Sequence, residues 1–142
     1  MKTKHAIAAM IAALAVNLVA QLADPGNGGG YMAIAAVVGL LVIPMSASRY
    51  VNVGWGFSGT SQRHDEFEQN VLARAGARAH VAVLLLLSAI FGWLVVAAQV
   101  GLPVPQSASD WGTVGLSVLG IGFAIPILFA ERMSPTTRME AE

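Results

Sequence analysis

The chain contains four apolar runs that carry no Asp, Glu, Lys or Arg, and this pattern constrains the fold more than any other feature. The runs cover residues 5–23, 31–48, 79–100 and 111–130. A helix rises about 1.5 Å per residue and the hydrocarbon core of a bilayer is about 30 Å thick, so roughly 17 to 25 residues are needed to cross it. Each run is long enough, and the sequence predicts four transmembrane helices.

Composition supports a membrane protein and excludes several other classes. Of the 142 residues, 56% are hydrophobic and 11% are charged, whereas a soluble domain carries roughly 25% charged residues. Eight basic residues balance eight acidic ones, so no basic excess exists to bind nucleic acid. The absence of cysteine removes disulfides and thiolate chemistry. We therefore expect one integral membrane domain, residues 1–142, with the lipid bilayer as a partner and no nucleic acid.

Turn-forming residues join the runs in pairs. Residues 24–30 are Asp-Pro-Gly-Asn-Gly-Gly-Gly, and residues 103–110 are rich in proline and serine, which are residues that favour turns. Residues 50–78 form the one long connection, and a helix from about residue 61 is expected to continue into the third span, with acids early and arginines late. The predicted fold is all-α, with two antiparallel hairpins.

The positive charges predict the orientation. Both turns between paired spans hold no basic residue and carry the acids Asp24 and Asp110. Lys and Arg near span ends stay on the cytoplasmic side. We expect a multi-pass protein of the cell (inner) membrane with both termini in the cytoplasm. All eight basic residues then lie on that side: Lys2, Lys4, Arg49, Arg63, Arg74, Arg78, Arg132 and Arg138.

The first run has a cleaved signal peptide as its alternative interpretation. Lys2 and Lys4 precede an alanine-rich stretch, but that stretch exceeds the 7 to 15 residues usual for a signal core, and no small-x-small cleavage site stands before Asp24. We expect it to remain as a span.

The two halves share an order of residues that raises the hypothesis of a parallel duplication of the hairpin, related by an axis along the membrane normal. Chance similarity between two apolar hairpins is the alternative. The first half contains His5, Gln21, Ile43, Pro44 and Arg49, and the second contains His80, Gln99, Ile125, Pro126 and Arg132.

Few polar groups lie within the spans, and these are the candidates for helix packing or for lining a pore. Asn17 is expected to bond a neighbouring helix, and Gln21 and Gln99 lie near the far interface. Pro44 and Pro126 each remove a backbone donor. They are expected to kink the second and fourth spans near the cytoplasmic side.

Two pairs of residues are candidates at the cytoplasmic face. Arg74 and Arg78 share a stripe of the loop helix and can reach lipid phosphates or an acidic partner. His5 and His80 open the first and third spans; they could ligate haem iron or a metal, although their spacing matches no metal signature. Anchoring at the interface is the simpler role, and no cofactor is expected.

No phosphate-binding glycine loop, HExxH pair or other catalytic motif is present in the sequence, so we expect no enzyme. By elimination, the sequence favours an accessory, assembly or regulatory subunit of a larger membrane complex, with a protein partner in the membrane or a second copy of the chain. A self-associating small transporter or channel is the alternative. A haem-binding electron-transfer subunit is a third hypothesis.

Overall fold

The computed structural model of this chain describes residues 2–26, 30–47 and 66–133. These ranges contain four helices, α1 (Lys2–Ala23), α2 (Gly30–Ala47), α4 (Glu66–Val100) and α5 (Ala108–Met133), and no strand. The prediction of an all-helical fold is therefore confirmed for the described residues.

Three of these helices are long and apolar enough to cross a membrane. Their apolar stretches are Lys4–Ala23 in α1, Gln69–Val100 in α4 and Ala108–Met133 in α5. The helix α2 is apolar as well and has 18 residues. The α4 helix begins at Glu66 and runs without a break past Arg74 and Arg78 to Val100; residues 61–65, where its start was predicted, lie outside the described part.

Local hydrogen bonds explain where α4 ends and α5 begins. Gly101 adopts a φ of 73°, and the Leu102 amide donates to the Ala97 carbonyl at 2.9 Å, which is the closing bond of a glycine C-cap. The Ser107 hydroxyl then caps α5 by accepting from the Asp110 amide at 3.1 Å, and the Ser107 amide donates to the Asp110 carboxylate at 3.2 Å. This reciprocal capping box starts a helix firmly.

The capping box places the start of α5 inside the predicted turn. Residues 103–110 were expected to form the turn before the apolar run of residues 111–130, and α5 begins at Ala108. The helix therefore starts three residues before the apolar run, because Ser107 acts as its cap.

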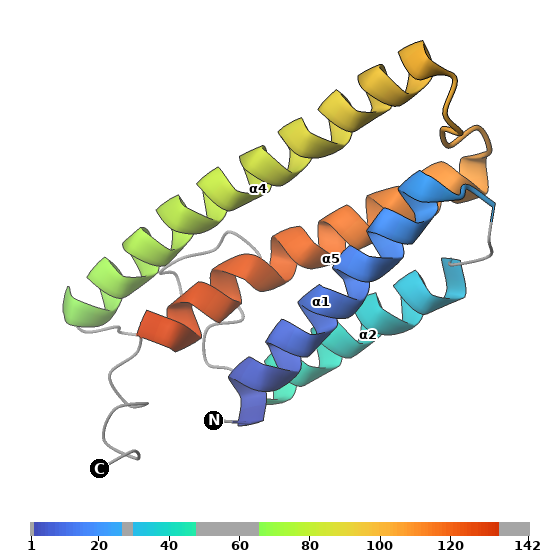
Figure 1. Cartoon of the computed structure of the whole chain (residues 1–142). Coiled ribbons are helices and arrows are strands. Elements are labelled where there is room, and N and C mark those ends of the chain that lie inside the picture. The colour runs from blue at the N-terminus through green and yellow to red at the C-terminus, as the bar shows by residue number, and fades with distance from the viewer. Residues whose placement is uncertain (1, 27–29, 48–65, 134–142) are drawn as a thin grey trace.

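The α5 helix is the centre of the bundle. It packs against α1, α2 and α4, whereas α2 packs on α1 and α5. Figure 1 shows α5 between α4 and the α1–α2 pair, and both views show α4 and α5 running in opposite directions. Its buried residues recur every three or four positions, as a helix face requires. They include Val114, Ser117, Ile121, Ala124 and Ile127.

Small residues permit close approach at two places along α2. A methyl group built on Gly39 would lie 2.5 Å from Cε of Met10 on α1, and one built on Gly30 would lie 3.1 Å from Oγ1 of Thr113 on α5. Small residues at membrane-helix contacts let backbones approach in this way.

Two apolar clusters hold the helices together. The larger runs along the bundle and joins Ile7, Leu14 and Leu18 of α1 to Ile90 of α4 and to the buried face of α5. The smaller joins Leu72 and Ala75 of α4 to Ala130 of α5. The second cluster fixes the start of α4 against the end of α5.

Candidate functional site

A polar pair bridges α1 and α5 inside the bundle. Nδ2 of Asn17 donates to Oγ of Ser117 at 3.2 Å, and Ser117 is completely buried. Gln21, one turn further along α1, is 2% exposed. Asn17, Gln21 and Ser117 therefore form a short polar stretch of the α1–α5 contact, surrounded by apolar residues of the larger cluster.

The other predicted polar or proline candidates do not join this stretch. Gln99 is exposed near the end of α4, in contrast to the buried Gln21. Pro126 is buried in α5, and the helix continues through it to Met133. Pro44 lies within the bounds of α2, but its side chain is outside the described part of the structure.

Asp110 closes the opposite end of the bundle from the basic residues. Its side chain is 9% exposed and accepts from the Ser107 amide. The backbone amides of Gln106 and Gly26 contribute further hydrogen bonding to the carboxylate. Gly26 lies just after α1, so this interaction links the end of α1 to the start of α5. Gly26 has a φ of 92°, a left-handed conformation that favours glycine.

The basic end of the bundle contains the second candidate site. Leu72 and Ala75 pack against Ala130, with Met133 beside them, and Arg74 and Arg78 remain exposed on α4. Nη1 of Arg78 lies 3.7 Å from Sδ of Met133, so the Arg78 guanidinium reaches across to α5.

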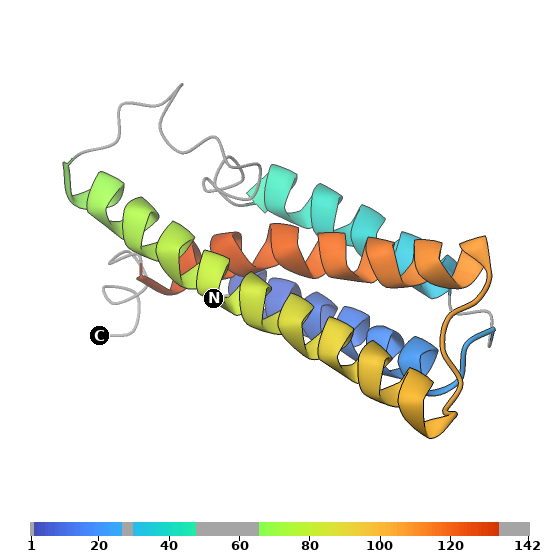
Figure 2. The ribbon, with the colours of Figure 1, turned by 90° about the horizontal axis from the view of Figure 1, so that it is seen from above.

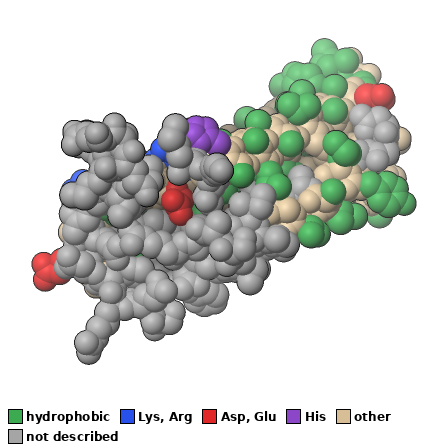
Figure 3. Space-filling view, turned by 90° about the horizontal axis from the view of Figure 1, so that it is seen from below, with side chains coloured by type: hydrophobic (Ala, Val, Ile, Leu, Met, Phe, Trp, Pro, Cys, Tyr) green, Lys and Arg blue, Asp and Glu red, His purple; other side chains and the backbone are tan. Residues whose placement is uncertain are grey.

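Sequence reasoning did not include Arg132 in this site. Arg132 is exposed on the last turn of α5, directly before the methionine that Arg78 contacts. The signal available was the predicted antiparallel pairing of the third and fourth spans, which brings the start of one to the end of the other. On the face seen in Figure 3, Lys and Arg side chains lie near one end, while hydrophobic side chains cover the other.

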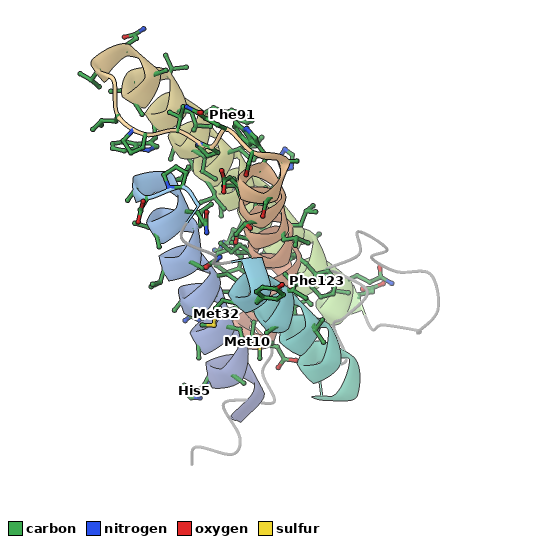
Figure 4. The ribbon with its side chains drawn as sticks, turned by 90° about the vertical axis from the view of Figure 1, so that its right-hand side faces the viewer. His5, Met10, Met32, Phe91 and Phe123 are labelled. Carbon is green, nitrogen blue, oxygen red and sulfur yellow. The ribbon has the colours of Figure 1, made fainter. Side chains whose placement is uncertain are left out.

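The two histidines lie on different helices and are both exposed. His5 projects outward from the first turns of α1 (Figure 4), and His80 lies on α4, which packs chiefly on α5. Within residues 2–26, 30–47 and 66–133, no group of three or more His, Cys, Asp or Glu side chains could hold a metal ion.

Most of the α4 surface is apolar and open. In the most apolar 18-residue stretch of α4, 11% of the residues are buried, whereas 50% are buried in the most apolar stretch of α5. The buried residues of α4 lie on a single stripe that includes Leu72, Ala75, Ala79, Ile90 and Ala97. The remaining faces expose large hydrophobic side chains, among them Val81, Leu84, Leu85, Phe91, Trp93, Val95, Val96 and Val100.

No family model, no curated protein and no solved structure matches this chain.

Proposed function

We propose that this chain is a multi-pass protein of the cell membrane that acts by helix packing, as an accessory, assembly or regulatory subunit of a larger membrane complex. In this proposal α1, α2, α4 and α5 all cross the bilayer as two antiparallel hairpins, with both termini in the cytoplasm. The basic residues of α1, α4 and α5 at one end of the bundle, and Asp24 and Asp110 at the other, support this orientation.

The exposed surface of α4 is the observation that carries the proposal. A helix buried on one stripe alone leaves its other faces available to a neighbouring helix along most of its length. Ser88 and Gly92 lie four residues apart on its exposed surface, and a methyl group built on Gly92 would meet nothing within 4 Å. Small residues at this spacing allow a second helix to approach closely.

The interior supports packing over transport. Asn17 is closer to the middle of α1 than Gln21, and its side chain donates to Ser117 on α5. The residues around this pair form a continuous apolar cluster from Ile7 to Ile127. A transport path would need polar side chains facing a common space, so a channel would require several copies of the chain with their outer faces joined.

Site-specific photo-crosslinking in living cells tests this proposal. A photoreactive residue is placed at Leu85 or Phe91 on the exposed surface of α4, and at Leu119 on α5 as the matched control. All three positions are at least half exposed. We expect a discrete protein adduct from the α4 positions and none from Leu119.

The mass of the adduct distinguishes the hypotheses. A larger adduct containing one different protein supports the accessory-subunit proposal. An adduct of twice the chain mass favours self-association, and with it the transporter alternative. Adducts to lipid alone from both faces would contradict a role in helix packing. A haem Soret band in the purified protein would instead support the haem-binding hypothesis, with His5 and His80 as the candidate ligands.

A further inference from the structure

We propose that Arg74, Arg78 and Arg132 form a binding site for the phosphate groups of an anionic phospholipid, at the cytoplasmic end of the contact between α4 and α5. The proposal requires α4 and α5 to cross the membrane in the orientation given above. It does not require the proposed protein partner.

The three arginines lie on the same side of the helix contact. In an α-helix each residue turns by about 100°. On α5, Ala130 and Met133 face α4. Arg132 lies about 100° around the helix from Met133, on the side away from Ala130. Glu131 lies about 100° from Ala130 in the other rotational direction. Arg132 and Glu131 therefore lie on opposite sides of the line that joins α5 to α4, about 100° apart around the helix, and both point partly away from α4.

The same rotation applies to α4. Leu72 and Ala75 face α5. Arg78 lies about 60° around α4 from Ala75, and Arg74 lies about 100° from Ala75 in the same direction. This is the rotational direction that leads from Met133 to Arg132 on α5. For two helices that face each other and run in opposite directions, the same rotational sense leads to the same side. The contact of Arg78 with Met133 agrees with this placement.

The depth of the arginines matches the phosphate level of a bilayer. Arg78 lies 22 residues before the end of α4 at Val100, which is about 33 Å of helix. Arg132 lies 21 residues after Trp111 on α5, which is about 32 Å of helix. The hydrocarbon core is about 30 Å thick. If the exposed Trp111 marks one interface, both arginines reach the headgroup region of the other leaflet, and Arg74 lies about 6 Å further out.

The helix contact beneath the arginines is tight. Ala75 and Ala130 are both completely buried, and two alanines allow the backbones of α4 and α5 to approach closely. The guanidinium groups therefore project from two helices that are in contact at this level. Across the helices, Arg78 contacts the thioether of Met133, a weak acceptor that a phosphate oxygen can replace with a charge-assisted hydrogen bond.

These features favour a lipid headgroup over a protein partner. Basic pockets between membrane helices on the cytoplasmic side are the usual sites for anionic lipid headgroups. The planar guanidinium suits bidentate binding of phosphate. An acidic protein segment would instead need to reach down to the level of Arg78, at the edge of the hydrocarbon.

Native mass spectrometry of the full chain tests the site. The detergent-solubilised protein is supplied with equal amounts of phosphatidylglycerol and phosphatidylcholine, and the retained lipids are counted. We expect phosphatidylglycerol to be preferred, and the double variant Arg78→Gln with Arg132→Gln to lose about fivefold of that preference for each arginine removed.

Matched variants separate the site from general electrostatics. The variant Lys2→Gln with Lys4→Gln removes the same charge from the same end of the bundle, on α1, and should keep the preference. Equal loss in both double variants, or no loss in either, would overturn the proposal. Arg78→Lys with Arg132→Lys preserves charge and folding, and should lose part of the preference because the bidentate geometry is gone.

Two further arms identify the ligand. Millimolar inorganic phosphate, added without lipid, should not raise the thermal stability of the protein in detergent, whereas phosphatidylglycerol should. Equal stabilisation by inorganic phosphate would contradict a lipid site. Loss of a co-purifying acidic protein in the double variant, with lipid retention unchanged, would assign the arginines to that protein instead.

Discussion

Asn17 of α1 and Ser117 of α5, one hundred positions apart in the chain, share a hydrogen bond of 3.2 Å within the bundle. The bond joins the first and last of the described helices and favours one position of α1 along α5. Hydrogen bonds between membrane helices typically contribute about 0.6 kcal/mol, with a maximum near 2 kcal/mol.

A double-mutant cycle on this pair should give a coupling free energy of about 0.6 to 2 kcal/mol. The variants are Asn17→Ala, Ser117→Ala and the combination, and the measurement is reversible unfolding in mixed micelles followed by tryptophan fluorescence. Ser88→Ala, an exposed serine on α4, is the control and should change stability by less than about 0.5 kcal/mol. Additive effects of Asn17→Ala and Ser117→Ala would show that the bond does not contribute.

Gly39 should tolerate alanine but not leucine. Among the described residues, a methyl group at Gly39 meets the terminal Cε and the Sδ of Met10, and a methionine side chain can move aside. We expect Gly39→Ala to cost less than about 1 kcal/mol of unfolding free energy and Gly39→Leu to cost about 1 to 3 kcal/mol. Met10→Ala should recover part of the loss in Gly39→Leu; a loss unaffected by Met10→Ala would place the clash elsewhere.

Ser107→Ala should destabilise α5 by about 0.5 to 2 kcal/mol, because it removes the acceptor of the Asp110 amide at the helix N-terminus. Ser109→Ala is the matched control, since Thr113 bonds to the backbone carbonyl of Ser109 and not to its side chain. Amide hydrogen exchange across residues 108–113 provides the local measurement. Unchanged protection in Ser107→Ala would mean that the capping box is dispensable.

Ala130→Leu should force α4 away from α5. Ala130 and Ala75 are completely buried together, so the larger side chain has no room, and overpacking costs about 1 to 3 kcal/mol. Ala77→Leu adds the same volume to an exposed position of α4 and should have little effect. The measurement is unfolding in mixed micelles; equal stability of the two variants would show that the Ala75–Ala130 contact is loose.

The helices themselves were accessible from the sequence, but their packing was not. Charge-free runs predicted helical segments where α1, α2, α4 and α5 lie, because composition and length determine that outcome. The buried faces could not be predicted in the same way. On α5 the buried face holds Thr113, Ser117 and Gly120 while Leu119 is exposed, since in a membrane hydrophobicity does not separate helix contacts from lipid-facing positions.

The candidate sites show the same division. Arg74 and Arg78 could be placed on one stripe of one helix from their spacing alone. Arg132 could not be added to them, because its position depends on how α5 rotates against α4, and that rotation is determined by Ala75, Ala130 and Met133. Likewise, Asn17 was predicted to bond a neighbouring helix, but its acceptor Ser117 lies one hundred positions away.

The central position of α5 has a consequence for biosynthesis. Of the four described helices, α5 is the last to leave the ribosome, yet each of the other three packs against it. If the helices cross a membrane as proposed, the surfaces of α1 and α4 that will contact α5 face lipid or insertion machinery until α5 is inserted. A chain interrupted before Ala108 would therefore lack the helix around which the earlier helices assemble. We expect such a chain to be degraded by cellular quality control.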